Sequence, residues 1–114
     1  MNDETSIHYG SLDADLQPYA AYFINAVRAA GVPLVLISGR RSSATNQTVG
    51  GAARSLHLYG FAFDVQVVGY RREEIPLAWW ARLGIFWESM GGRWGGRFSP
   101  PDLNHFDAGY SAQV

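Results

Sequence analysis

The ten residues from Ser55 to Asp64, SLHLYGFAFD, constrain the fold of this chain more than any other segment. They place His57 and Asp64 seven positions apart, with Gly60 between them. In an extended strand this spacing would separate the two side chains by roughly 23 Å, whereas ligands of one metal ion lie close together. If both residues bind one ion, the chain must bend between them, and glycine accepts backbone angles that other residues avoid. We therefore predict a sharp bend at Tyr59–Gly60.

A second polar segment near the end of the chain supplies further candidate ligands. PDLNHF at 101–106 contains Asp102 and His105, whose spacing lets both side chains point to one side across a turn. Neutral imidazoles together with one carboxylate suit zinc, with a water in the fourth position of a catalytic site. With His57 and Asp64 as the other ligands, Asp102 is left to act as the base that takes the proton of that water.

Each residue of this pattern also has an ordinary structural explanation. Asp64 could be a polar residue on the solvent face of a half-exposed strand, and Asp102 could form a turn after two prolines. Arg40 and Arg41 could be a solvated loop pair, or could neutralise a developing oxyanion or hold a substrate carboxylate. His8 lacks partners at a useful spacing and is expected to be a surface or hydrogen-bonded residue. The catalytic interpretation therefore depends on the joint pattern.

Composition narrows the functional classes. The chain has 114 residues, 47% of them hydrophobic, which fits one compact domain spanning 1–114. The formal net charge of −1 gives no indication of a nucleic-acid partner, and the absence of cysteine excludes disulfides and thiolate metal sites. The polar N-terminus lacks the features of a secretory signal, and no apolar run approaches a membrane span. We expect a soluble chain made in the cytoplasm.

The first half of the chain predicts one helix and one strand. Residues 1–11 are expected to form a loose lead-in. A helix over 13–30 would have Pro18 in its first turn or at a break and would end at Gly31. Its apolar stripe consists of Leu16, Ala20, Phe23, Ile24 and Val27. A buried strand is predicted at 33–38.

The second half predicts a long polar loop at 38–55, a strand at 61–68 and a helix at about 73–90. In the strand, Phe61, Phe63, Val65 and Val67 share one face, and Ala62, Asp64 and Gln66 share the other. The helix is expected to turn inward Ile75, Trp79, Leu83, Phe86 and Trp87. Together these elements predict an α+β fold, in which helices pack on one side of a small, mainly antiparallel sheet with the zinc in a groove.

In its motifs the chain resembles the zinc D-Ala-D-Ala carboxypeptidase and L-alanyl-D-glutamate peptidase family. This family includes phage endolysins and vancomycin-resistance D,D-dipeptidases. The family motif S-x-H-x-x-G-x-A-x-D is matched by Ser55, His57, Gly60, Ala62 and Asp64. The upstream S-G-Y-R-S element and a following glutamine are similar to Ser38-Gly39-Arg40-Arg41-Ser42 and Gln47. The W-G-G-x-W and D-x-x-H-F elements are similar to Trp94-Gly95-Gly96-Arg97-Phe98 and to Asp102, His105 and Phe106.

The resemblance implies a role for each matched position. It implies that zinc is bound by His57, Asp64 and His105. It implies that Asp102 is the general base and that Arg41 contacts the transition state or a substrate carboxylate. Supporting or substrate-binding positions would be Ser55, Gln47 and Arg40. The chain departs from the family pattern at Arg40, where an aromatic residue is usual, and at Phe98, which replaces the second tryptophan.

The resemblance thus predicts a zinc metallopeptidase that hydrolyses bacterial peptidoglycan stem peptides. The expected activity is that of an L-alanyl-D-glutamate endopeptidase of the phage-endolysin type, acting on the cell wall as a monomer after release through a membrane lesion. Neither nucleic acid nor membrane is an expected partner. One alternative is a D-alanyl-D-alanine carboxypeptidase or dipeptidase. Another is a non-catalytic, zinc-stabilised cell-wall-binding or virion-structural module.

Overall fold

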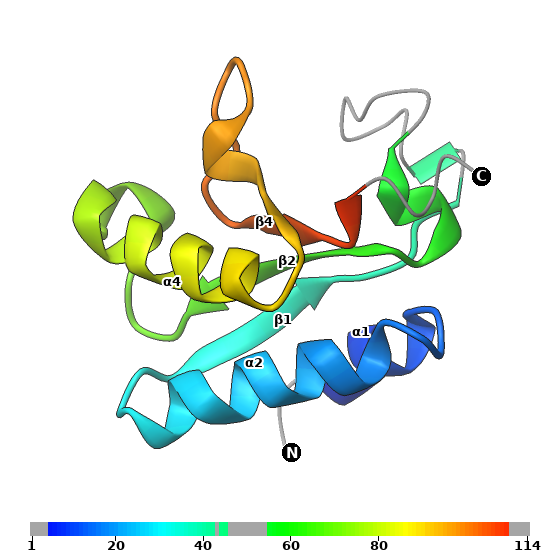
Figure 1. The fold of residues 1–114 in the computed structure, drawn as a ribbon, viewed down its shortest axis with the longest axis horizontal. Helices are drawn as coiled ribbons and strands as arrows, with labels where there is room; N and C mark the ends of the chain where they lie inside the picture. The colour runs from blue at the N-terminus through cyan, green and yellow to red at the C-terminus, as the bar shows by residue number, and fades with distance from the viewer. Residues whose placement is uncertain (1–4, 43, 46–54, 110–114) are drawn as a thin grey trace.

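The structure is a computed structural model that describes residues 5–42, 44–45 and 55–109. Its four strands form one antiparallel sheet in the order β1-β2-β4-β3, and α2 and α4 lie over it (Figure 1). The helices are α1 (Thr5–Ser11), α2 (Gln17–Ala29) and α4 (Leu77–Ser89). The strands are β1 (Leu34–Ser38), β2 (Ala62–Val67), β3 (Arg93–Trp94) and β4 (His105–Asp107), and the 3-10 turns are η1 (Leu56–Tyr59), η2 (Arg72–Glu74) and η3 (Gly95–Arg97).

The register of β2 against β4 separates the core from a polar face. Phe63 lies opposite Phe106, and the next pair along the ladder is Asp64 opposite His105. Because successive side chains of a strand point to opposite faces, the phenylalanines face the helices and the polar pair faces away from them. The predicted α+β fold with a mainly antiparallel sheet is confirmed.

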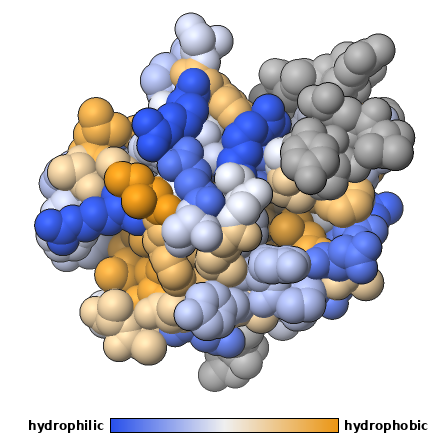
Figure 2. Space-filling view, in the orientation of Figure 1, coloured by the Kyte–Doolittle hydropathy of each residue, from blue (hydrophilic) through white to orange (hydrophobic). Residues whose placement is uncertain are grey.

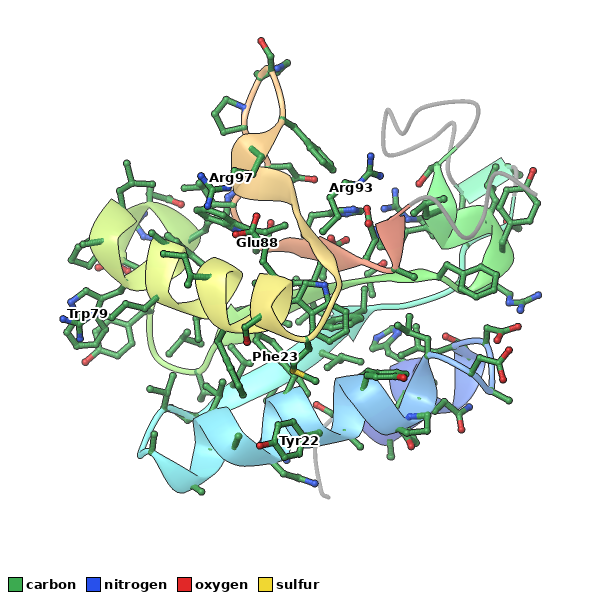
Figure 3. The ribbon with its side chains drawn as sticks, viewed as in Figure 1. Tyr22, Phe23, Trp79, Glu88, Arg93 and Arg97 are labelled. Atoms are coloured by element: carbon green, nitrogen blue, oxygen red, sulfur yellow. The ribbon has the colours of Figure 1, made fainter. Side chains whose placement is uncertain are left out.

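Aromatic rings join both helices to the sheet. Phe23 of α2 points toward α4 and the sheet (Figure 3), and its ring centroid lies 5.3 Å from that of Trp87 and 5.0 Å from that of Phe106. The predicted α2 stripe is buried, Pro18 lies in the first turn, and Gly31 has the positive φ of 95° that ends the helix. In the described part of the chain, none of the helices has the length and apolar character needed to cross a bilayer.

Two of the predictions about helices are wrong. The predicted loose lead-in is wrong over residues 5–11, because they form α1, and the buried Thr5 hydroxyl accepts the Leu36 N–H at 2.9 Å; residues 1–4 lie outside the described part of the chain. The helix predicted at about 73–90 is α4, which begins only at Leu77. Its Trp79 is 58% exposed rather than turned inward. The error arose from Ile75, which has extended backbone angles and so does not set the phase of α4.

The true inward face of α4 consists of Trp80, Gly84 and Trp87. These residues recur at the spacing of one helical face. The outer face of α4 leaves large hydrophobic side chains exposed, namely Leu77, Trp79 and Ile85. In Figure 2, orange residues over α4 lie beside strongly hydrophilic ones.

Trp87→Ala is expected to lower the free energy of unfolding by about 3–5 kcal/mol, the usual cost of removing a large buried aromatic ring. Trp87 is only 1% exposed, and its Nε1 also donates to the Asp107 carbonyl at 2.9 Å. Denaturant unfolding measures this loss. Trp79→Ala is the matched control on the same helix, because its ring is exposed, and an equal loss in both variants would contradict this assignment of the core.

Candidate active site

The predicted bend between His57 and Asp64 is present as η1. The Ser55 side chain accepts the His57 N–H at 3.2 Å and so caps the turn. Gly60 ends it in the left-handed region, with φ of 79°, after which the chain enters β2. This reversal places the His57 ring, 1% exposed, beside the start of the strand that carries Asp64.

The three predicted ligands converge on one point. His57 Nε2 lies 3.3 Å from His105 Nδ1 and 3.4 Å from Asp64 Oδ2. His105 Nδ1 lies 3.5 Å from Asp64 Oδ1. A tetrahedral ion with bonds of about 2.0–2.1 Å holds its ligand atoms about 3.3 Å apart, so these separations match a zinc site.

The remaining atoms of the ligands also fit a metal. His57 Nδ1 lies 2.8 Å from the Gly39 carbonyl oxygen, which can only accept, so the proton is on Nδ1 and the Nε2 lone pair points into the cluster. His105 Nε2 donates to the Asp107 carboxylate at 2.7 Å, which leaves Nδ1 as its ligand atom. Among the described residues, the buried Asp64 Oδ1 has no hydrogen-bond partner. The donor set therefore fits zinc, with a buried oxygen in need of a cation.

Asp107 is a functional residue that the sequence analysis missed. It is fully buried and is held by Arg93, which donates from Nε at 3.0 Å and from Nη2 at 2.8 Å. The Gly109 N–H adds a third donor at 2.7 Å. Its position two residues after His105 in a strand was the available signal, because such residues share a face. Arg93 thereby fixes the carboxylate that orients the His105 ring.

The charges of the cluster support one another. Burial alone would raise the pKa of Asp64, but the adjacent imidazoles of His105 and His57 outweigh it and hold this pKa well below its usual range. Burial alone would lower the pKa of His105, but its hydrogen bond to Asp107 and the nearby carboxylate of Asp64 raise it to about 9. Burial likewise opposes ionisation of Asp107, yet His105 and Arg93 lower its pKa. The pocket is thus arranged to stabilise positive charge.

Asp107→Asn is expected to weaken zinc binding by about 10–100-fold, the usual effect of changing a group that orients a metal-binding histidine. Asparagine keeps the size of the side chain but removes the charge that faces His105 Nε2. Competition against a chelator of known affinity measures the change. Glu88→Gln is the control, since this carboxylate pairs with Arg97 on the surface, and equal affinities in the two variants would contradict the role of Asp107.

The proposed base lies beside the cluster at the edge of a groove. Asp102 Oδ2 is 3.9 Å from His105 Nδ1, and the side chain is 46% exposed. The Asp102 N–H donates to the Gly95 carbonyl at 2.8 Å, and Gly95 is required because a Cβ there would collide with the Asp102 carbonyl. Asp64, Asp102 and Arg41 all line a groove of about 560 Å³.

The other predicted site residues have varied surroundings. Arg41 Nη2 lies 3.6 Å from Asp64 Oδ2, so the structure brings it to the cluster. Arg40 lines the same groove, but its guanidinium donates to the Ser11 carbonyl at 3.2 Å and the Tyr59 carbonyl at 3.1 Å. Gln47 lies outside the described residues. The substrate contacts predicted for Ser55, Gln47 and Arg40 stay predictions.

Known proteins share this fold. The chain is similar to the L-Ala D-Glu endopeptidase ChiX of Serratia marcescens, with a TM-score of 0.71, 20% identity, and coverage of 96% of this chain and 90% of that one. It is also similar to a mutant of the vancomycin-resistance D,D-pentapeptidase VanY from a VanB-type cassette, solved with Zn(II). That match has a TM-score of 0.61, 18% identity, and coverage of 90% and 76%. No curated protein matches the sequence.

The sequence model of the Peptidase M15 family matches residues 2–84, which is more than half of the chain. The matched part contains His57 and Asp64, and β4 brings His105 to them from outside it. The match confirms the predicted resemblance. It also confirms that the chain is an enzyme rather than a non-catalytic module. The chain belongs to the Peptidase M15 family and is a zinc-dependent peptidase.

Proposed function

We propose that this peptidase hydrolyses the L-alanyl-D-glutamate bond of bacterial peptidoglycan stem peptides. The observation that carries the proposal is the His57–Asp64–His105 cluster, in which both histidines are buried, with a half-exposed carboxylate, Asp102, beside it in a groove. The likeness to ChiX, an L-Ala D-Glu endopeptidase, over nearly the whole chain supports the choice of bond.

The residues divide the chemistry among them. His57, Asp64 and His105 would hold the zinc, which when bound lowers the pKa of a water toward about 7 and polarises a peptide carbonyl. Asp102 accepts the proton of the attacking water and returns it to the leaving amine, since its carboxylate is partly exposed beside His105. Arg41, next to Asp64, opposes the negative charge that develops on the carbonyl oxygen.

A D-alanyl-D-alanine carboxypeptidase is the second candidate, favoured by the likeness to VanY, a D,D-pentapeptidase. The same cluster would serve either reaction. The two bonds differ in what leaves: a carboxypeptidase releases a single terminal residue, whereas an endopeptidase releases a longer peptide.

Digestion of purified peptidoglycan separates the two candidates. Zinc-loaded protein is expected to release fragments with a new C-terminal alanine and a new N-terminal glutamate, identified by mass spectrometry. Chelator-treated protein is the control. Release of free D-alanine alone would support the second candidate, and the absence of any new amino terminus would contradict both.

A further inference from the structure

Arg72 lies at the groove on the side of Asp102, and neither the motifs nor the proposed mechanism uses it. It belongs to η2, and its Nη1 lies 3.5 Å from Asp102 Oδ1. The same atom donates to Asn104 Oδ1 at 3.1 Å. The side chain is 57% exposed, and among the described residues no hydrogen bond uses its Nε or Nη2. The planar, permanently charged guanidinium of Arg72 therefore has donors left for a ligand in the groove that it lines.

The fold fixes Arg72 at this place. Its carbonyl accepts from the Nε1 of Trp80, a ring that is 1% exposed, at 3.2 Å. Asn104, whose Oδ1 accepts the hydrogen bond from Arg72, also forms two hydrogen bonds of 3.0 Å with Val65 of β2. The arginine thus connects the start of α4 to the strand that carries Asp64.

A second hollow continues the groove past Arg72. This hollow, of about 390 Å³, is lined by Trp80, Ile75 and Gln66 among others. It shares Ile37, Arg72 and Asn104 with the groove at the cluster. A peptide that crosses the cluster toward Asp102 would therefore pass over Arg72 and have room to continue.

The chemistry of the proposed substrate indicates which of its groups Arg72 would contact. Asp102 returns its proton to the leaving amine, so the leaving residue must come close to Asp102 and hence to Arg72. In the proposed substrate this residue is D-glutamate, which has two carboxyl groups. If the substrate peptide continues through the side-chain carboxyl of D-glutamate, the α-carboxylate is free. Its carbon is then two bonds from the leaving nitrogen. An arginine is the side chain best suited to bind such a carboxylate in a bidentate manner.

We infer that Arg72 binds the free carboxylate of the residue on the leaving side of the scissile bond, and that the hollow beyond it accepts the continuing peptide. The inference rests on the proposed function. It assigns two of the arginines that line the groove to different tasks: Arg41 faces the reacting carbonyl, and Arg72 selects the leaving residue.

Two peptides test the assignment, both L-Ala-D-Glu-L-Lys joined through the side-chain carboxyl of D-Glu. One has the α-carboxyl free, and in the other it is a carboxamide. The wild-type protein is expected to cleave the carboxylate peptide with a KM about tenfold lower than that of the amide. Arg72→Gln is expected to raise the KM for the carboxylate peptide about tenfold and to leave that for the amide nearly unchanged, with zinc content unaltered. These factors correspond to the typical contribution of a charged hydrogen bond.

Arg82→Gln is the matched control, because it removes the same charge from the exposed side of α4, away from the groove. It should leave both KM values unchanged. Equal effects of Arg72→Gln on the two peptides would assign Arg72 to holding Asp102 or the fold, and would overturn the inference while the proposed function stands. If wild-type protein cleaves neither peptide nor peptidoglycan, the proposed function fails and the inference falls with it.

Discussion

His57→Ala is expected to abolish peptidase activity together with zinc binding. The variant leaves only one imidazole and one carboxylate, whereas catalytic zinc sites use three protein ligands. Wild-type protein should gain thermal stability with zinc, by about 4 kcal/mol at a free zinc concentration a thousand times the Kd. The variant should show no such gain. Thermal unfolding with and without zinc, beside assays of peptide cleavage, measures both effects.

The comparison with and without zinc separates loss of a ligand from loss of the fold. The His57 ring is buried, so its removal also leaves a small cavity and lowers stability in the absence of metal. His8→Ala is the matched histidine control, since His8 is not in the cluster, and it should keep the zinc-dependent gain. A His57→Ala protein that still gains stability from zinc would show that the ion binds elsewhere.

The part of the metal cluster formed by His57 and Asp64 was predictable because local geometry encodes it. Ser55 and Gly60 begin and end the turn that returns His57 toward Asp64, and each leaves a recognisable residue type in the sequence. The pairing of Asp64 with His105 follows from two short strands whose apolar neighbours, Phe63 and Phe106, must both enter the core. The hydrophobic pattern therefore sets the register of these two cluster residues.

Features that depend on distant contacts could not be predicted in the same way. Arg93 reaches Asp107 across neighbouring strands, and Arg72 reaches Asp102 after the chain has passed through α4 and returned. No periodicity connects such pairs. α1 was missed for a related reason: its anchor is the Thr5 hydroxyl, which receives the Leu36 N–H from β1, and a single threonine carries no recognisable signal.

Asp102→Asn is expected to lower kcat by about 10²–10⁴-fold, the usual contribution of a general base, while zinc stays bound. Asparagine has nearly the same shape as aspartate but cannot accept a proton. It also keeps an oxygen that can accept from Arg72, which lies 3.5 Å from Asp102 Oδ1. The change therefore removes the proton acceptor and spares the surroundings. Steady-state kinetics on the carboxylate peptide, with zinc content determined on the same samples, measure the loss.

Comparison with His57→Ala shows whether the loss of kcat in Asp102→Asn is due to the base and not to the metal. His57→Ala loses activity because it loses zinc, whereas Asp102→Asn should lose activity with its zinc retained. Asp15→Asn is the matched control, because it neutralises an exposed carboxylate that belongs neither to the cluster nor to the groove beside it and should keep full kcat. If Asp102→Asn keeps full kcat with zinc bound, the proton must leave by another group. The half-exposed carboxylate beside His105 would then be a turn residue, as its position after two prolines also allows.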